Sequence, residues 1–237
     1  KLIEQADYLS TKYQVVVTNP PYMGKGMSDK LSKYLSDNYN DAKSDLFSAF
    51  ILRNLNLCLP GGQLGFMTPF VWMFISSYEK LRKHLIKHTC ITSLIQLEYS
   101  GFDGATVPIC TFTLENSVNP KPKGGYIKLS EFRGSENQAP RTLEAIANPD
   151  CGWFFRCKTS EFTKIPGAPI AYWVSDKIRD IFSSSKPLAE IASPKQGLAT
   201  ADNDRFLRQW FEASHDRIGF GMKNREEARQ SGKKWFP

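Results

Sequence analysis

Four consecutive residues, Asn19, Pro20, Pro21 and Tyr22, have the chemistry to hold the amino group of a planar ring. Such an amine is a poor nucleophile because its lone pair is delocalised into the ring. The side-chain oxygen of Asn19 and the backbone carbonyl of Pro20 can accept its two N–H bonds, and neither acceptor needs a shifted pKa. The prolines fix the backbone before a substrate arrives, and Tyr22 can stack on the ring. The four residue types therefore indicate chemistry at an exocyclic amine.

A short β-branched run precedes these residues and would position them. Residues 15–17 are all valine, without polar alternation, which is typical of a strand buried on both faces of a parallel sheet. The two prolines then prevent both further ladder pairing and a helix. In an open α/β sheet ligands bind at the carboxyl ends of strands, so this placement favours a functional site. The alternative is an ordinary proline turn, with Asn19 as a turn residue and Tyr22 as packing.

The segments that follow have the order of the second half of a doubly wound α/β sheet. Residues 23–41 predict a loop with a short helix, either a lid over the site or a polar connector. A helix is expected from Ser44 as N-cap, with Asp45 in its first turn and apolar residues at helical spacing as far as Leu59. The remaining expected elements are strands over 63–68 and 91–98, a helix over 78–87, and an antiparallel hairpin partner over 106–115 that closes the sheet edge.

This alternation of strand and helix breaks near residue 116. Residues 120–125 are a linker by composition, and residues 126–193 mix short strands, prolines and aromatic residues. Glycine and small side chains within residues 196–206 would let the backbone approach a phosphate or a base. A tight Asn/Asp loop explains that segment equally well.

Composition favours a cytoplasmic protein that can bind polyanions. The chain has 237 residues, of which 41% are hydrophobic, so it can hold one large domain or one domain and part of another. It contains no membrane-span run and no signal segment. The net charge is +7, and residues 151–237 carry 15 basic against 10 acidic side chains. This excess suggests a phosphate-facing surface, although ordinary solubility requirements also explain a modest positive charge.

The cysteines and histidines indicate neither a disulfide framework nor a metal site. The five cysteines are odd in number and scattered, which is typical of reduced thiols. His84 and His88 are four residues apart in a lysine-rich helix, which has the spacing of a metal pair. No carboxylate or cysteine completes a site nearby in the sequence, so a solvated helix face is the better interpretation. No metal is expected.

The motif from Asn19 to Tyr22 resembles the catalytic motif of amino-group methyltransferases that use S-adenosylmethionine. Over nearly its whole length the chain is similar to the large adenine-specific DNA methyltransferases of type IIG restriction systems and BREX phage defence, the PglX group. The resemblance implies an α/β fold: the C-terminal half of a Rossmann-like S-adenosylmethionine methyltransferase sheet, followed by an α+β connecting and target-recognition region. Further matching segments are residues 45–51, 59–66, 72–74, 78–82 and 102–109.

The resemblance also implies roles for individual residues. Asn19, Pro20, Pro21 and Tyr22 would form the catalytic turn. Tyr22 and Phe102 would hold the flipped base from two sides, and Phe50 would pack against the adenine of the cofactor S-adenosylmethionine. Core packing is the alternative for Phe102, and it is equally plausible for Phe50.

The expected division is a catalytic methyltransferase domain over residues 1–118, a connecting region over 119–193, and the start of a target-recognition domain over 194–237. In the enzymes that the chain resembles, a glycine-rich turn after the first strand binds the methionine moiety of the cofactor. No such turn precedes Asn19, and the glycine pairs elsewhere in the chain are wrongly placed for that role. We therefore expect a fragment that begins just before the catalytic strand, lacks the cofactor-binding N-terminal half and ends within the recognition domain. Alone, such a fragment is expected to bind the cofactor poorly and to be inactive.

The expected function is site-specific methylation of adenine N6 in DNA, within restriction-modification or BREX phage defence. The expected partners are double-stranded DNA with a flipped adenine and other defence-system proteins, with no membrane. Cytosine N4 methylation needs nearly the same acceptors, and only the resemblance argues against it. A protein-glutamine or RNA methyltransferase is an alternative, since such enzymes share the motif. A non-catalytic DNA-binding fragment is a third possibility.

Overall fold

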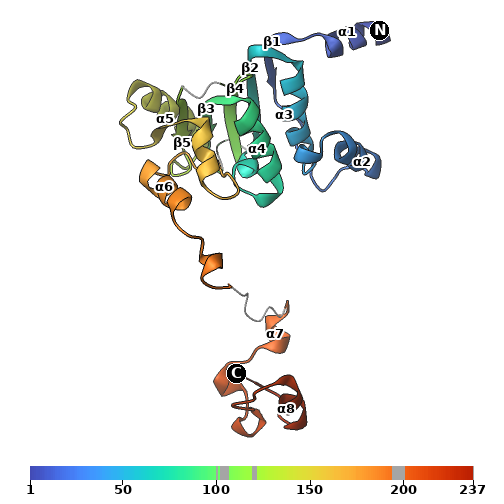
Figure 1. Ribbon diagram of the computed structural model, residues 1–237, viewed down its shortest axis with the longest axis vertical. Helices are drawn as coiled ribbons and strands as arrows, with labels where there is room; N and C mark the ends of the chain where they lie inside the picture. The colour runs from blue at the N-terminus through green and yellow to red at the C-terminus, as the bar shows by residue number, and fades with distance from the viewer. Residues whose placement is uncertain (100, 102–106, 119–121, 194–200, 237) are drawn as a thin grey trace. The chain divides into compact units, whose positions relative to one another are not determined.

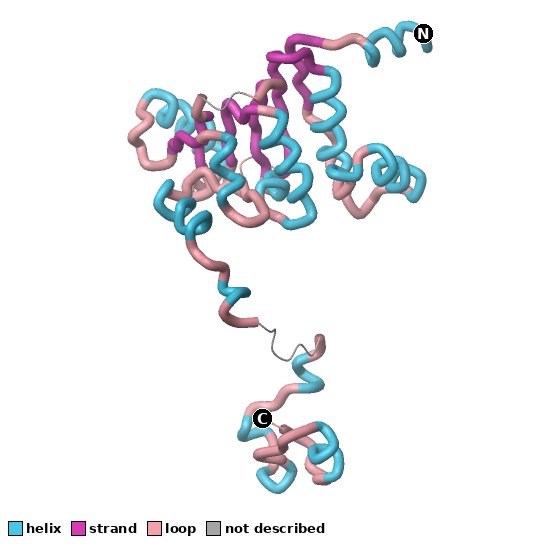
Figure 2. Tube along the Cα trace, in the orientation of Figure 1, coloured by secondary structure: helices cyan, strands magenta, loops and turns pink. Residues whose placement is uncertain are grey.

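Six strands form one mixed sheet in the order β1-β2-β4-β3-β5-β6 (Figure 1). The computed structural model describes residues 1–99, 101, 107–118, 122–193 and 201–236. The strands lie side by side in the same body (Figure 2). Their bounds are β1 (Tyr13–Thr18), β2 (Cys58–Pro69), β3 (Cys90–Gln96), β4 (Ile109–Glu115), β5 (Gly124–Lys128) and β6 (Phe154–Cys157).

The sheet contains both parallel and antiparallel pairs. β1 and β2 are parallel, and β4 runs antiparallel to both of its neighbours, β2 and β3. β5 is parallel to β3, and β6 runs antiparallel to β5. The strands β1, β2, β3 and β5 therefore all end at the same edge of the sheet, which is where loops in such folds bind ligands.

The helices connect these strands and cover parts of the sheet. The helix bounds are α1 (Leu2–Ser10), α2 (Asp29–Asn38), α3 (Leu46–Leu57), α4 (Glu79–His88), α5 (Ser135–Ala147), α6 (Asp176–Ser184), α7 (Asn203–Phe206) and α8 (Arg225–Gln230). α3 and α4 share one buried cluster with β2, β4 and β3, so they cover the same face of the sheet (Figure 1). α5 contributes Ala145 to a second cluster with Leu97, Ile109 and Ile127. None of the described helices is long and apolar enough to span a membrane.

Helix α3 begins one residue later than expected. Asp45, not Ser44, is its N-cap: the backbone of Asp45 is extended, and its carboxylate accepts a hydrogen bond from the Phe47 amide at 3.2 Å. The Ser44 hydroxyl instead donates to the carbonyl of Ser77, at 3.0 Å. Both residue types are good caps, and this long-range contact of Ser44 decides between them. The predicted helix over 78–87 is confirmed as α4.

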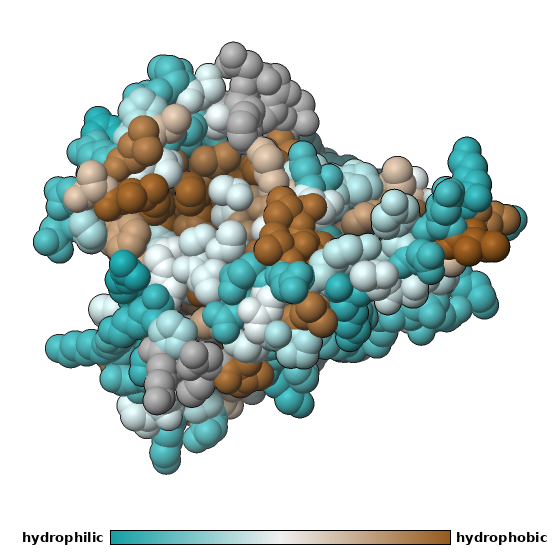
Figure 3. All heavy atoms as spheres, turned by 90° about the horizontal axis from the view of Figure 1, so that it is seen from above, coloured by the Kyte–Doolittle hydropathy of each residue, from teal (hydrophilic) through white to brown (hydrophobic). Residues whose placement is uncertain are grey.

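The valine strand forms as predicted, but the prediction that it is buried on both faces is wrong. Val16 packs against the main core, whereas Val15 and Val17 are 61% and 75% exposed. β1 lies at one end of the strand order and pairs only with β2 among the described strands. One face of β1 meets the α3 side of the sheet, and no described element covers the other. Exposed hydrophobic patches of this kind are visible on the molecular surface (Figure 3).

The hairpin of β3 and β4 is confirmed, but it does not close the sheet edge. β4 lies between β2 and β3, and the sheet continues through β5 and β6. Gly124 and Gly125, expected in a linker, are the first residues of β5. A Cβ on Gly124 would clash with the carbonyl oxygen of Ile91, so the close approach of β5 to β3 requires glycine there. Residues 120 and 121 of that linker lie outside the described residues.

The chain divides into two compact units, Lys1–Lys186 and Pro187–Pro237. The first holds the whole sheet together with α1 to α6. The second holds α7 and α8 and an isolated bridge between Ile218 and Trp235. The boundaries expected at residues 118 and 193 separate regions by function and not by compactness. That division stays a prediction. Much of the expected recognition-domain opening, residues 196–200, lies outside the described residues.

Candidate active site

The turn from Asn19 to Tyr22 leaves the end of β1 directly beside β2. Thr18, the last residue of β1, pairs with Phe66 of the parallel strand β2. Asn19 is exposed at this edge, while Pro20 is buried. Pro20 therefore anchors the turn in the protein, whereas Asn19 and Pro21 are exposed at the edge of the sheet where ligands bind in such folds.

Tyr22 is held at both its hydroxyl and its ring. The hydroxyl lies within donating distance of Oδ1 of Asn19, at 3.1 Å, and of the carbonyl oxygen of Met67, at 3.2 Å. The ring meets Phe47 edge-on, with centroids 6.2 Å apart and an interplanar angle of 86°. Tyr22 remains 37% exposed, so part of its ring is open to a ligand. Partial burial raises the pKa of Tyr22, with a smaller contribution from Cys110, and the hydroxyl therefore stays a donor at neutral pH.

Asp45 joins this turn to the start of helix α3. Its Oδ1 accepts hydrogen bonds from the backbone amides of Met23, at 2.9 Å, and Phe47, at 3.2 Å. Phe47 is fully buried and stacks on Tyr78, with centroids 5.6 Å apart. Burial raises the pKa of Tyr78 to about 12, and the negative charge of Asp45 adds to the shift. The N-terminal end of α3 thus supplies both Phe47, which supports the Tyr22 ring, and Asp45, which anchors the backbone of Met23.

Phe50 lies one turn further along α3, on the side that meets α2. It lines an apolar slot of about 210 Å³ together with Leu31, Tyr34 and Leu46, and Arg53 lies at the same slot. Aromatic and aliphatic walls of this kind suit a planar ring such as adenine. The surroundings of Phe50 therefore fit the ring of a nucleoside cofactor, which is the role that the sequence predicts. The role itself stays a prediction.

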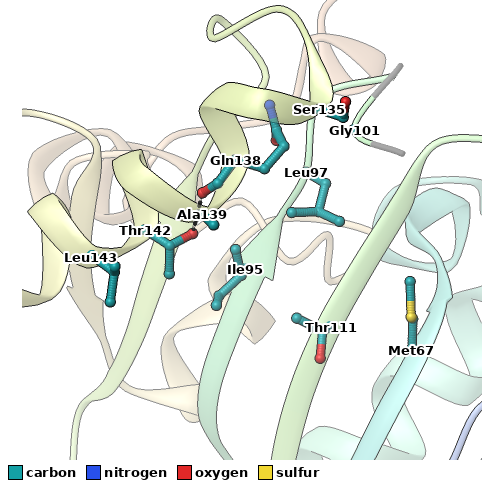
Figure 4. Close-up of a pocket in the computed structure, with 10 residues that line it drawn as sticks. All are labelled: Met67, Ile95, Leu97, Gly101, Thr111, Ser135, Gln138, Ala139, Thr142 and Leu143. Carbon is teal, nitrogen blue, oxygen red and sulfur yellow. Dashed lines mark hydrogen bonds between the residues drawn. The ribbon is translucent and has the colours of Figure 1, made fainter. Parts of the chain in front are cut away.

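Phe102, the second expected base-holding residue, lies outside the described residues. The neighbouring Gly101 is buried and lines a largely apolar groove of about 830 Å³ between α5 and the sheet (Figure 4). Met67 of β2 also lines this groove, and its carbonyl is the acceptor next to the Tyr22 hydroxyl. The groove and the turn from Asn19 to Tyr22 therefore meet at the same residue of β2.

His84 and His88 are neighbours on helix α4. The rings of His84 and His88 are 4.6 Å apart on α4, and His84 is half-buried. Burial lowers the pKa of His84, with a further contribution from His88. Within the described residues, no group of three or more His, Cys, Asp or Glu side chains could hold a metal ion. The five cysteines are free, and four of them are buried.

Comparison with known proteins shows which protein families the chain resembles. The sequence profile described as Eco57I restriction-modification methylase matches residues 2–102. The chain is 34% identical over 241 residues to the adenine-specific methyltransferase PglX of Lacticaseibacillus casei (strain Zhang), a match that covers 100% of the chain and 20% of the relative. It is 31% identical over 243 residues to the adenine-specific methyltransferase BrxX of Escherichia coli O9:H4 (strain HS), covering 99% of the chain and 19% of BrxX. The chain is therefore similar to members of the PglX group over its whole length. The resemblance read from the sequence is thereby confirmed, and the chain spans about a fifth of the length of these two relatives.

The fold agrees with this relationship. The methyltransferase subunit of a type I restriction-modification system from Streptococcus thermophilus superposes with a TM-score of 0.50 at 21% identity, covering 65% of the chain and 36% of the subunit. This similarity shows a methyltransferase fold of the Rossmann-like α/β class. The fold class read from the sequence is therefore confirmed for the sheet.

The turn from Asn19 to Tyr22 can be recognised in the sequence, whereas the residues that hold it in place cannot. Asn19 and Tyr22 are three residues apart in the sequence, and a hydrogen bond joins their side chains directly. In the sequence Asp45 carries only the signal of a helix start, and Phe47 only that of an apolar helix face. The carbonyl of Met67 carries no sequence signal, because any residue type supplies one. These three supports come from positions 22 to 45 residues further along the chain.

Proposed function

We propose that this chain contains the catalytic turn of a site-specific DNA methyltransferase that transfers a methyl group to adenine N6 and serves restriction-modification or BREX phage defence. The observation that carries the proposal is the pairing of Asn19 with Tyr22 at the carboxyl end of β1. That pairing puts an amide acceptor and a partly exposed aromatic ring at one point of the sheet edge. The relatives, both of them adenine-specific methyltransferases by name, support adenine over cytosine.

Asn19 and Pro20 would act on the amino group of the base. Their oxygens accept its two N–H bonds and so favour a pyramidal nitrogen, whose lone pair is no longer shared with the ring. Tyr22 would stack on the base once it has left the duplex, and Phe47 supports the tyrosine from behind. Phe102 is the proposed second aromatic contact. Because the turn is held by buried Pro20 and by Asp45, these groups need little rearrangement when the base arrives.

The proposed cofactor is S-adenosylmethionine, which supplies an electrophilic methyl group on a sulfonium centre. Phe50 and the slot that it lines with Tyr34 and Leu46 would bind its adenine ring. The slot and the catalytic turn both adjoin the first two turns of α3, so ring and reacting nitrogen would be held by the same helix. Binding of the methionine and ribose moieties is not assigned to residues of this chain.

The test is a methylation assay of the complete protein with S-adenosylmethionine and unmodified bacterial DNA. Mass spectrometry of the digested nucleosides reports which base gains a methyl group. We expect N6-methyladenine, and a loss of at least about 100-fold in rate for Asn19→Ala, the scale expected for removing a preorganised acceptor. Asn148→Ala is the matched control, because Asn148 is an exposed asparagine beyond α5 whose side chain only accepts from the Asp150 amide.

Other outcomes would point to the alternatives. N4-methylcytosine would keep the acceptor chemistry and change the substrate base. No modified base from correctly folded protein would favour a protein-glutamine or RNA substrate. DNA binding that persists in Asn19→Ala, without methylation by the wild type, would favour a non-catalytic DNA-binding role.

A further inference from the structure

We propose that Asp45 is a positioning residue that holds the catalytic turn in register with helix α3. It does so through the backbone of Met23, the residue directly after Tyr22, and not through contact with a substrate. The inference rests on the proposed methyl transfer for its catalytic consequence, whereas the contact itself can be tested without activity.

Both carboxylate oxygens of Asp45 face the turn. Oδ1 accepts from the Met23 amide at 2.9 Å and from the Phe47 amide at 3.2 Å, so one oxygen joins the turn and the helix. Oδ2 lies 3.0 Å from the position that a Cβ on Gly24 would occupy. A side chain at position 24 would press against this carboxylate, and glycine there allows the turn to approach it closely.

The Asp45 carboxylate lies at the N-terminal end of helix α3. α3 has 12 residues, and its free amides at the N-terminus attract a negative charge. Tyr78 has a raised pKa, first from its own burial and then from the charge of Asp45. Tyr78 is therefore a neutral neighbour of the carboxylate that accepts from the amides of Met23 and Phe47.

Two separate links run from this helix end to the catalytic turn. Asp45 holds the backbone immediately after Tyr22, and Phe47 supports the Tyr22 ring edge-on at 6.2 Å. Leu46 and Phe50 of the same helix line the slot proposed for the cofactor ring. The first turns of α3 thus connect the acceptor of the amino group to the site of the methyl donor. An error in this spacing would slow the transfer step more than it would weaken DNA binding, because reaction rates depend steeply on the alignment of the reacting atoms.

The test compares Asp45→Ala and Asp45→Asn with the wild type in the complete protein. Asparagine retains an Oδ1 acceptor and is a good N-cap, so it should restore what alanine loses. Ser175→Ala is the matched control: Ser175 caps α6 by accepting from the Ile178 amide at 3.4 Å, on a helix with no contact to the turn. It measures what the loss of a helix cap alone does to melting temperature and activity.

Two readouts decide the outcome. We expect the Met23 amide to exchange its hydrogen at least about 10-fold faster in Asp45→Ala than in the wild type, because its acceptor is lost. We also expect kcat to fall by about 10- to 100-fold while KM for DNA stays within about two-fold. Asp45→Asn should stay close to the wild type in both measurements, and Ser175→Ala should change neither.

Unchanged exchange at Met23 in Asp45→Ala would overturn the proposal. So would a kcat for Asp45→Ala equal to that of Ser175→Ala, since Asp45 would then act as a cap and nothing more. A wild-type protein that methylates no base would instead overturn the proposed function. In that case hydrogen exchange at Met23 still decides whether Asp45 holds the turn.

Discussion

The Tyr22 hydroxyl has two carbonyl oxygens within reach but a single proton to donate. One oxygen belongs to Asn19, at 3.1 Å, and the other to Met67, at 3.2 Å. An amide oxygen has two lone pairs, so Asn19 can accept from Tyr22 and from a substrate amine at the same time. The tyrosine therefore orients the Asn19 side chain with its oxygen, and not its NH2 group, toward the hydroxyl. In this arrangement Tyr22 has a polar task in addition to stacking.

Tyr22→Phe separates these two tasks, because it keeps the ring and removes the hydroxyl. We expect kcat to fall by about 5- to 10-fold, the effect of losing one neutral hydrogen bond of about 1 kcal/mol. KM for DNA should remain nearly unchanged, since the stacking surface is retained. Steady-state methylation assays measure both values. Tyr22→Ala is the companion variant, and it should raise KM as well.

The pH dependence of the reaction checks the same hydrogen bond. Partial burial raises the pKa of Tyr22 above its usual value of 10.0, which disfavours the phenolate and keeps the donor intact. The rate should therefore show no loss between about pH 7 and pH 9 that can be traced to this residue. A decline in that range that disappears in Tyr22→Phe would contradict the assignment.

Among the elements, the segment that follows β2 depends on one buried charge. Arg82 of α4 is 1% exposed and donates to four backbone carbonyls: those of Trp72 and Ile75 beyond β2, and those of Gly167 and Ala168 before α6. Its guanidinium geometry allows five donors to be used at once. Burial lowers the pKa of Arg82, yet an arginine remains charged at neutral pH. This side chain therefore fixes two distant loops to one helix.

Replacing Arg82 should destabilise the fold strongly. Arg82→Met removes every donor and leaves buried carbonyls without partners, which we expect to cost at least about 3 kcal/mol of unfolding free energy. Arg82→Lys keeps the charge and up to three donors, so its unfolding free energy should lie between those of the wild type and Arg82→Met. Urea unfolding measures the differences. Lys83→Ala is the neighbouring control: Lys83 forms an exposed pair with Glu79 at 2.6 Å, so its removal should leave the unfolding free energy nearly unchanged.

At the scale of the whole molecule, sequence patterns predict individual helices and strands better than they predict which strands lie side by side in the sheet. Helices α3 and α4 are predictable because their apolar residues repeat at the helical period. The position of β4 between β2 and β3 depends on pairings such as Gln63 with Glu115, far apart in the sequence. The exposure of Val15 and Val17 is unpredictable for the same reason, since it depends on what lies beside β1. The turn proposed as catalytic is contiguous and therefore visible in the sequence, whereas Asp45 and Met67 reach it only through the fold.

The sheet also extends beyond the catalytic boundary expected at residue 118. Tyr126 of β5 is fully buried, as are Phe162 and Tyr172, and all three belong to the same core cluster as β2 and β4. Tyr126 and Tyr172 stack with centroids 5.0 Å apart, and the Tyr172 hydroxyl donates to Gln96 of β3 at 2.8 Å. Structurally, these residues complete the core of the first unit. They contribute to folding whichever function the connecting region has.

This shared core makes a prediction about C-terminal truncation. A protein that ends after Lys186 keeps the whole first unit, and it should retain the melting midpoint that the sheet has in the complete protein. A protein that ends after Val118 loses Tyr126, Phe162 and Tyr172. Burial of each such side chain contributes about 1.5–3 kcal/mol, and three of them together approach the 5–15 kcal/mol that stabilises a typical domain. We therefore expect no cooperative melting transition from the sheet after truncation at 118, as measured by circular dichroism. A normal transition in that shorter protein would mean that residues 1–118 form a folding unit with β5 and β6 as an optional addition.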